Sequence, residues 1–157
     1  MKLRTDTFDL WIFSRQPDEP RYLLFHTSQE KADRWFGGGG FWQTPPGGLI
    51  EDNESLQHAI NRIVGGLNLT LRAVWAAEYS YTIWNRRRSG LEMLPVFAAE
   101  VEEAKEVPMT WEASQQGWFT ARECEERLFF RGHKESLKYI REYVSEVQEP
   151  AAMLRVL

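Results

Sequence analysis

Aromatic and β-branched residues near the N-terminus form two short runs, at residues 7–14 and 21–27. The segment between them contains Gln16-Pro17-Asp18-Glu19-Pro20, which is typical of a turn, so the runs predict two strands of a hairpin. Two longer runs of the same kind, at residues 71–85 and 91–102, are joined by Asn85-Arg86-Arg87-Arg88-Ser89-Gly90. The Ser-Gly ending is typical of a hairpin tip, so these runs predict a long antiparallel pair.

A different period lies between the two hairpins, where apolar residues recur at three-four spacing and predict one helix with a continuous buried stripe. Its members are Leu56, Ala59, Ile60, Ile63, Val64 and Leu67. Gly65 and Gly66 each destabilise a helix by roughly 1 kcal/mol relative to alanine. We therefore expect the helix to end near Val64, with a glycine in its C-terminal turn.

The remaining segments predict shorter elements. Residues 28–40 read as a polar loop that ends in four glycines, followed by a short strand at 41–43 and, later, a last strand within 109–119. The glycines suggest a flexible connection or a phosphate cradle, and the absence of a following Gly-Lys-Ser/Thr favours the connection. Thr120 and Glu123 form a capping-box pattern before a helix at 121–129, and a C-terminal helix carries Leu137, Ile140, Val144 and Val147. This order predicts an α+β fold with a mixed sheet between helices.

Length, charge and cysteine content exclude several classes of protein. The 157 residues are about one domain, which we place at 1–157. The net charge of −4 argues against a nonspecific nucleic-acid partner. One cysteine, Cys124, excludes an intrachain disulfide, and the first residues lack an apolar signal region. No segment approaches the roughly 20 apolar residues of a membrane span. We therefore expect a cytoplasmic protein without a membrane partner, and we leave its oligomeric state, including a homodimer, open.

Residues 48–70, called the box below, resemble the Nudix box, whose pattern is Gly, five residues, Glu, seven residues, then Arg-Glu-apolar-any-Glu-Glu-any-Gly-apolar. Gly48, Glu54 and Arg62 stand in register with this pattern. The second half departs from it, because the three later glutamates are replaced by Ile63, Gly66 and Leu67, and the closing glycine by Leu69. The resemblance implies the Nudix fold over nearly the whole chain.

The three replaced positions carry the chemistry of the family that the chain resembles. In that family, Mg²⁺ neutralises charge on a diphosphate while water attacks phosphorus, and Mg²⁺ needs oxygen ligands. Positions 63, 66 and 67 share one helix face, which is apolar in this chain. Losing three carboxylates predicts metal binding by this mode that is weaker by at least about a hundredfold.

The resemblance also suggests site residues. Glu54 and Arg62 are the candidate catalytic residues, and Glu51 with Glu54 the candidate metal ligands. For Glu54, His58 and Arg62, the alternative is an exposed helix face with an ion pair. The candidate substrate-binding residues are Trp42, Gln43, Gly47, Gly48, Arg86 and Arg87. For these, the alternatives are a core role for Trp42 and a charged hairpin tip that protects a strand edge.

Two functional hypotheses follow. FWQ before the box, Glu78-Tyr79, PVFAAEV and GWFT look most similar to the branch that hydrolyses nucleoside and pterin triphosphates with Mg²⁺. The first hypothesis is such an enzyme, weakened or altered, with added carboxylates from Glu78, Glu92 or Glu100. The second is a binding or regulatory protein that holds a nucleotide or pterin phosphate without cleaving it and needs no cofactor. His26 and His133 lie far in sequence from any acidic cluster, and we expect ordinary core or surface roles for them.

Overall fold

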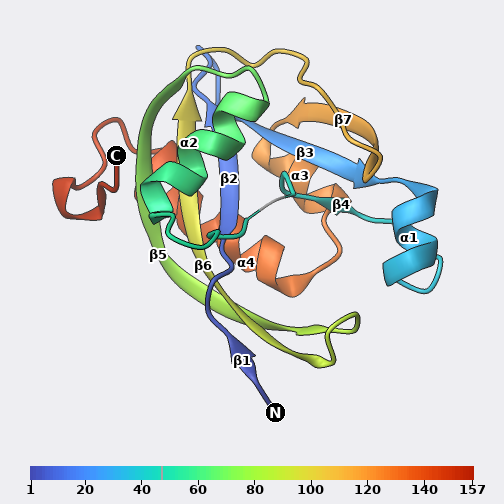
Figure 1. Cartoon of the computed structure of the whole chain (residues 1–157). Helices are drawn as coiled ribbons and strands as arrows, with labels where there is room; N and C mark the ends of the chain where they lie inside the picture. The colour runs from blue at the N-terminus through green and yellow to red at the C-terminus, as the bar shows by residue number, and fades with distance from the viewer. Residues whose placement is uncertain (47) are drawn as a thin grey trace.

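The computed structural model describes residues 1–46 and 48–157 and has a mixed sheet with helices on both faces (Figure 1). Its strands are β1 (Leu3–Arg4), β2 (Asp9–Ser14), β3 (Arg21–Thr27), β4 (Trp42–Gln43), β5 (Leu71–Asn85), β6 (Gly90–Val101) and β7 (Ala113–Phe119). Its helices are α1 (Gln29–Trp35), α2 (Leu56–Gly66), α3 (Ala121–Arg127) and α4 (Arg131–Ile140), which continues as a π-helical turn at Arg141–Ser145; a 3-10 turn follows at Ala152–Leu154. The α+β prediction is confirmed.

The sheet has the order β1-β6-β2-β3-β4, with β5 added beside β6 and β7 beside β3. Strand β2 runs parallel to β6, with Asp9 opposite Val96, whereas β3 is antiparallel to β2. The long hairpin β5–β6 is antiparallel and is interrupted by a bulge between Ala76 and Ser80, where Glu78 has a φ of 56°. Both predicted hairpins are therefore present.

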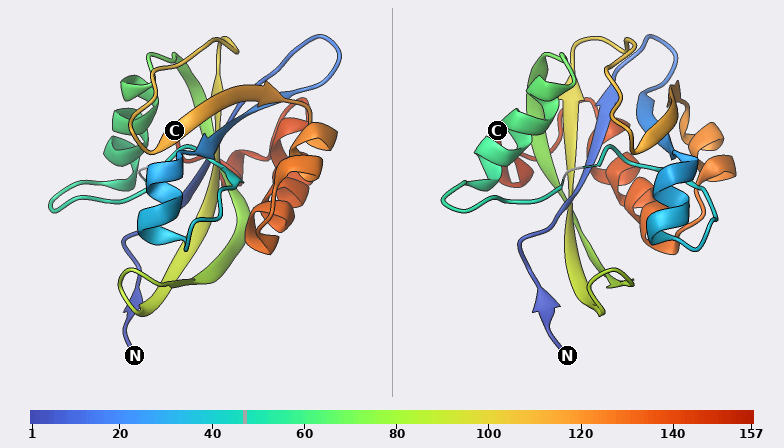
Figure 2. Two further views of the ribbon diagram at one scale, coloured as in Figure 1. Left: turned by 90° about the vertical axis from the view of Figure 1, so that its right-hand side faces the viewer. Right: turned by 45° about the vertical axis from the view of Figure 1, so that its right-hand side comes forward.

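Two apolar clusters fill the space between the sheet and its helices. Helix α2 covers one face through Ala59, Ile60, Ile63 and Val64, which are buried as the sequence predicted. Helices α3 and α4 cover the opposite face (Figure 2). Trp11 and Tyr22 belong to the apolar cluster that lies between these helices and the sheet. The alternation of side chains along β2 and β3 thus supplies both layers.

One predicted loop was wrong in part, and one helix ends slightly later than predicted. Residues 28–40 are not a loop throughout, because Ser28 caps α1: its hydroxyl accepts a hydrogen bond from the backbone N–H of Lys31. Helix α2 ends at Gly66, two residues beyond Val64, and Gly65 and Gly66 lie in its C-terminal turn as predicted. The residue in left-handed conformation after α2 is Asn68, with a φ of 57°, rather than a glycine.

Candidate functional site

A cavity of about 330 Å³ lies beside the start of β2. It is bounded by β4 and the segment after it, by the distal part of the β5–β6 hairpin, and by residues at the ends of α1 and α4. Four aromatic side chains form much of its apolar lining: Phe36, Phe41, Trp84 and Phe130. Phe41 meets the rings of Phe36 and Phe130 edge-on, each at a centroid distance of 4.8 Å. Such a lining suits a flat ring.

A buried carboxylate, Asp9, forms the polar centre of this cavity. Its Oδ1 accepts a hydrogen bond from Thr44 Oγ1 at 2.6 Å, and its Oδ2 accepts one from the Tyr81 hydroxyl at 2.9 Å. His133 Nε2 lies 4.0 Å from the same Oδ2. Burial, followed by the charge of Asp9, raises the pKa of Tyr81 far above its usual value. Tyr81 therefore stays a neutral donor that holds Asp9 in place.

Further polar groups line the cavity without being fully used. Gln43 Nε2 and His133 Nδ1 are buried and have no hydrogen-bond partner among the described residues. Lys31, only 5% exposed, pairs with Glu112 at 3.4 Å, and burial lowers its pKa although Glu112 opposes the shift. Buried polar atoms are nearly always paired in folded proteins. The amide and the imidazole are thus candidate groups for binding a ligand.

The box lies next to this cavity, and its surviving polar residues bind each other. Arg62 donates from Nε and Nη2 to the two carboxylate oxygens of Glu54, at 2.8 and 2.9 Å, and from Nη2 to Leu49 O at 2.7 Å. The backbone N–H of Glu51 also donates to Glu54, at 2.9 Å. The Arg62 guanidinium, with that N–H, lowers the pKa of Glu54 to about 2. This arrangement fixes the loop before α2 to the helix.

Solved structures resemble this architecture along almost its whole length. A protein from Listeria monocytogenes assigned as a Nudix hydrolase matches 96% of this chain and 99% of its own, with a TM-score of 0.71 and 17% identity. The Escherichia coli dihydroneopterin triphosphate pyrophosphohydrolase matches 93% and 100%, with a TM-score of 0.61 and 15% identity. The Nudix domain of Shewanella oneidensis NrtR, solved with ADP ribose, matches 90% and 88%, with a TM-score of 0.65 and 15% identity. The chain has the Nudix fold.

The chain is similar to these proteins in structure but not detectably in sequence family. No protein-family model matches the chain, and no curated protein sequence matches it. The predicted Nudix fold is confirmed, and a fold of this kind serves many different sites. The chemistry therefore depends on the residues of this chain.

Among the described residues, the structure contains no helix with the length and apolar character of a membrane span.

The box of this chain does not supply the oxygen ligands that a divalent ion needs. Ile63 is 9% exposed and packs into the core under α2, while Gly66 and Leu67 offer no side-chain oxygen. Both oxygens of Glu54 are bound by Arg62, and Glu51 lies 3.9 Å from the same guanidinium. Across residues 1–46 and 48–157, no group of three His, Cys, Asp or Glu side chains could hold a metal ion.

The candidate substrate residues do not all lie in the cavity. Gln43 lines the cavity, whereas Trp42 does not: it packs edge-on against His26 and Phe119, on the side of α3. Gly48 also lines the cavity, and Gly47 lies outside the described residues.

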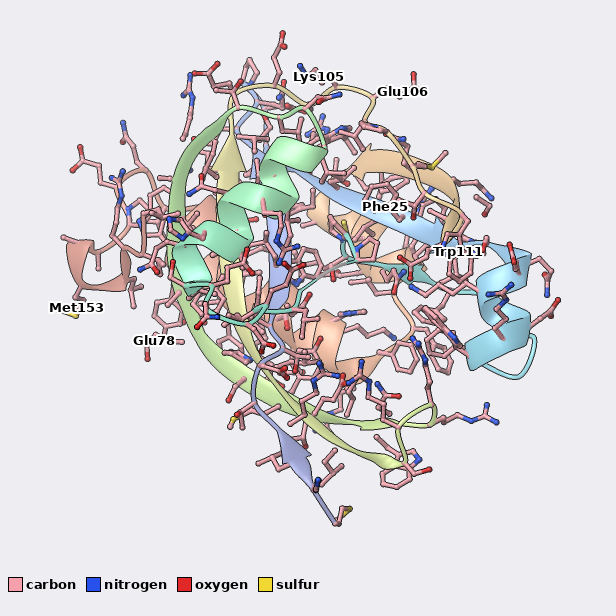
Figure 3. All side chains as sticks on the ribbon, in the orientation of Figure 1. Phe25, Glu78, Lys105, Glu106, Trp111 and Met153 are labelled. Atoms are coloured by element: carbon pink, nitrogen blue, oxygen red, sulfur yellow. The ribbon has the colours of Figure 1, made fainter. Side chains whose placement is uncertain are left out.

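The arginines of the hairpin tip contact the segment around α1. The Arg87 guanidinium lies 4.6 Å from the centre of the Trp35 ring. Trp111 packs edge-on against the same ring, beside α1 (Figure 3). A Cβ added at Gly37 would lie 3.1 Å from Nη1 of Arg86, so that side chain reaches the glycine-rich segment after α1. These contacts place the tip at the aromatic end of the cavity, where Trp84 and Phe36 form its lining.

Sequence reasoning missed the polar centre, Asp9 with Thr44, Tyr81 and His133. The available signal was Asp9 itself, the one charged residue within the apolar run at 7–14. A charge inside a buried strand needs partners, but the sequence does not show which distant residues supply them. For His133 the sequence predicted an ordinary core or surface role, and it did not predict the position of this residue beside Asp9.

We predict that His133 makes the protein less stable in mild acid. Burial lowers the pKa of His133 below its usual 6.5, although Asp9 opposes the shift. The unfolded state therefore binds the proton more readily, so the stabilisation is complete above about pH 6.5 and is lost as the pH falls toward the folded-state value.

Urea denaturation from about pH 5 to about pH 8 measures this effect. His133→Gln should flatten this part of the profile, whereas His58→Gln, at an exposed position on α2, should leave it unchanged. Parallel profiles for wild type and His133→Gln would contradict the prediction.

Proposed function

We propose that this protein binds a nucleoside or pterin phosphate with the ring in the aromatic cavity, and that its box does not support Mg²⁺-dependent hydrolysis of that ligand. The observation that carries the proposal is the grouping of Asp9, Gln43 and His133 in one cavity. Asp9 accepts hydrogen bonds and the Gln43 amide donates them, so the cavity can read the polar edge of a heterocycle. Its aromatic lining supplies the stacking surface.

The acceptor character of the cavity favours rings that present N–H groups. Three carboxylates, Asp9, Glu92 and Glu112, line it together with one lysine, Lys31. A guanine or pterin ring carries adjacent ring N–H and amino donors that a carboxylate can accept in a bidentate manner. The pterin substrate named for the Escherichia coli neighbour and the ADP ribose bound to the NrtR domain support a ligand of this general class.

The proposed loss of hydrolysis rests on what occupies the box. A hard cation needs oxygen ligands, and the three box positions instead place an isoleucine in the core and a glycine and a leucine at the end of α2. The added carboxylates of the enzyme hypothesis are engaged or remote. Glu100 pairs with Arg15 at 3.2 Å, and Glu92 accepts a hydrogen bond from Asn85 at 2.9 Å. Glu78 lies at the outer edge of β5 (Figure 3).

A thermal-shift titration with nucleoside and pterin triphosphates, in EDTA and in Mg²⁺, tests the proposal. A ligand at about a hundred times its Kd stabilises the folded state by about 2.7 kcal/mol, so binding is readily seen. We expect equal stabilisation in EDTA and Mg²⁺, and its reduction in Gln43→Ala. Gln57→Ala, at an exposed position on α2, is the matched control.

The two parts of the proposal fail separately. No stabilisation by any of these compounds would refute the binding. The alternative outcome is that the wild type releases phosphate or pyrophosphate in a Mg²⁺-dependent reaction that Glu54→Gln abolishes. That result would show that the box is catalytic and would restore the enzyme hypothesis.

A further inference from the structure

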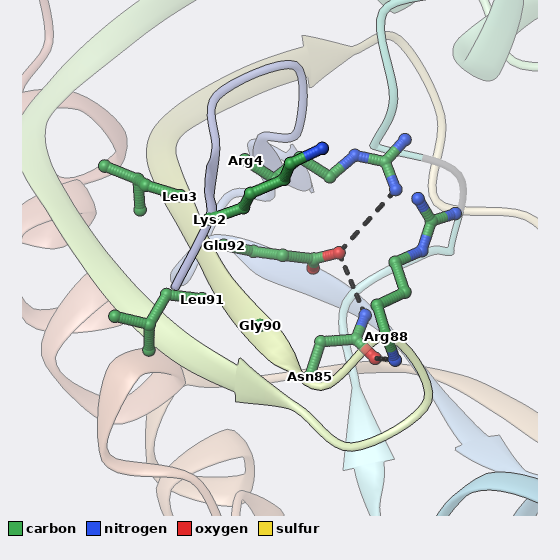
Figure 4. A pocket seen from close by; sticks show the side chains of 8 residues that line it. All are labelled: Lys2, Leu3, Arg4, Asn85, Arg88, Gly90, Leu91 and Glu92. Carbon is green, nitrogen blue, oxygen red and sulfur yellow. Dashed lines mark hydrogen bonds and ion pairs between the residues drawn. The ribbon is translucent and has the colours of Figure 1, made fainter.

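A second cavity, of about 290 Å³, lies where the N-terminal strand meets the tip of the long hairpin (Figure 4). Strand β1 pairs in parallel with β6, with Leu3 opposite Leu91 and Arg4 opposite Glu92. This register brings Lys2 and Arg4 beside Arg88, which is more than eighty positions away in the sequence. The cavity is therefore built by the fold and is not visible as a motif.

Positive charge is in excess in this cavity. Arg4 donates to the carboxylate of Asp6, and its Nη1 lies 3.9 Å from Glu92. The side chains of Lys2 and Arg88 make no hydrogen bond or ion pair with any described residue. In Figure 4 the guanidinium groups of Arg4 and Arg88 lie on the same side of the Glu92 carboxylate. Like charges gathered in this way repel each other, and an anion between them relieves the repulsion.

Glu92 connects the two cavities because it lines both of them. Its carboxylate is held in place by Asn85, whose Nδ2 donates to Oε1 at 2.9 Å. The aromatic cavity, with its three carboxylates, lies on one side of this residue, and the cationic cavity lies on the other. The two cavities together thus complement a molecule that has a ring rich in hydrogen-bond donors at one end and negative charge at the other.

We propose that Lys2, Arg4 and Arg88 form a phosphate-binding pocket. The pocket binds the phosphates of the ligand whose ring occupies the aromatic cavity, so this inference rests on the proposed function. Guanidinium groups match phosphate oxygens geometrically and keep their charge at all physiological pH values. The pocket holds the phosphates without a metal ion. Its arginines and lysine therefore neutralise the negative charge of the phosphates, which the box cannot do because it does not bind a metal ion.

The test uses inorganic tripolyphosphate as a probe for the pocket alone, titrated calorimetrically in EDTA. We expect saturable binding that weakens by at least about tenfold in Arg88→Gln, because one charge-assisted contact is worth roughly 1.5 to 3 kcal/mol. Lys2→Gln, at the residue before β1, should also weaken it. Arg122→Gln removes the same charge from α3, at a side chain that is 89% exposed, and should change affinity by less than about twofold.

A second titration, comparing GTP with guanosine in EDTA, links the pocket to the ring site. We expect GTP to bind more tightly than guanosine in the wild type and to lose most of that advantage in Arg88→Gln. Guanosine binding without tripolyphosphate binding would overturn the pocket and leave the ring site standing. Tripolyphosphate binding that is equally weakened by Arg122→Gln would also overturn it, since the effect would then be one of net charge.

Discussion

Asp9→Ala should lower the free energy of unfolding by about 3 to 5 kcal/mol, because it removes the shared acceptor of one buried and one half-buried donor. Thr44 Oγ1 and the Tyr81 hydroxyl both donate to this carboxylate, and Thr44 is buried while Tyr81 is half-buried. Urea denaturation measures the loss. Asp52→Ala, at an exposed position in the loop before α2, is the matched control and should change stability by less than about 0.5 kcal/mol.

Asp9→Asn separates the structural role of Asp9 from ligand recognition. The amide keeps the shape of the side chain and one acceptor oxygen, so most of the stability should be retained. Binding of a ring that donates two hydrogen bonds should weaken, because the amide nitrogen cannot accept. Unchanged ligand affinity in a folded Asp9→Asn variant would contradict the role of Asp9 in reading the ring.

Gly48→Ala should lower the free energy of unfolding by about 3 kcal/mol through a backbone clash. A Cβ at Gly48 would lie 1.9 Å from the carbonyl oxygen of Phe8, and Phe8 N–H donates to Gly48 O at 2.9 Å. Neither backbone can move without disturbing that hydrogen bond and the start of β2. The first glycine of the box is thus required by packing against β2.

Gly65→Ala is the matched control for this substitution. A Cβ at Gly65 would meet nothing within 4 Å, and the residue is helical. Alanine there should raise the free energy of unfolding by about 0.5 to 1 kcal/mol. Urea denaturation of both variants gives the comparison. Similar changes in the two variants would show that the close approach at Gly48 is relaxed in solution.

Local patterns predicted much of the fold, because each depends on residues near each other in the chain. The apolar stripe of α2, the Thr120–Glu123 capping box and both hairpins were confirmed. Helix α1 was missed, because it has only seven residues and is mostly polar, so no apolar period marked it. Its single signal was Ser28, a residue that is equally common in loops.

The candidate site was less predictable, because its residues come from distant segments. Gln43 and Gly48 were named from their position before and within the box, and both line the cavity. Asp9 meets Tyr81 and His133 only because β2 pairs in parallel with β6 and α4 packs on β5, and such pairings have no local signature. The ion pair of Glu54 with Arg62, eight residues apart, was weighed as an alternative from helical spacing.

The bulge at Glu78 divides the β5–β6 hairpin into a proximal half bound to the core and a distal half that extends beyond it. Members of the two apolar clusters on this hairpin lie at Tyr81 or earlier and at Val96 or later. The distal half therefore has a lower local unfolding free energy than the protein as a whole. Because it contributes walls to both cavities, we expect local opening of this half to influence how fast an occupant enters and leaves. Residence time would then depend on the stability of the hairpin as well as on the contacts inside.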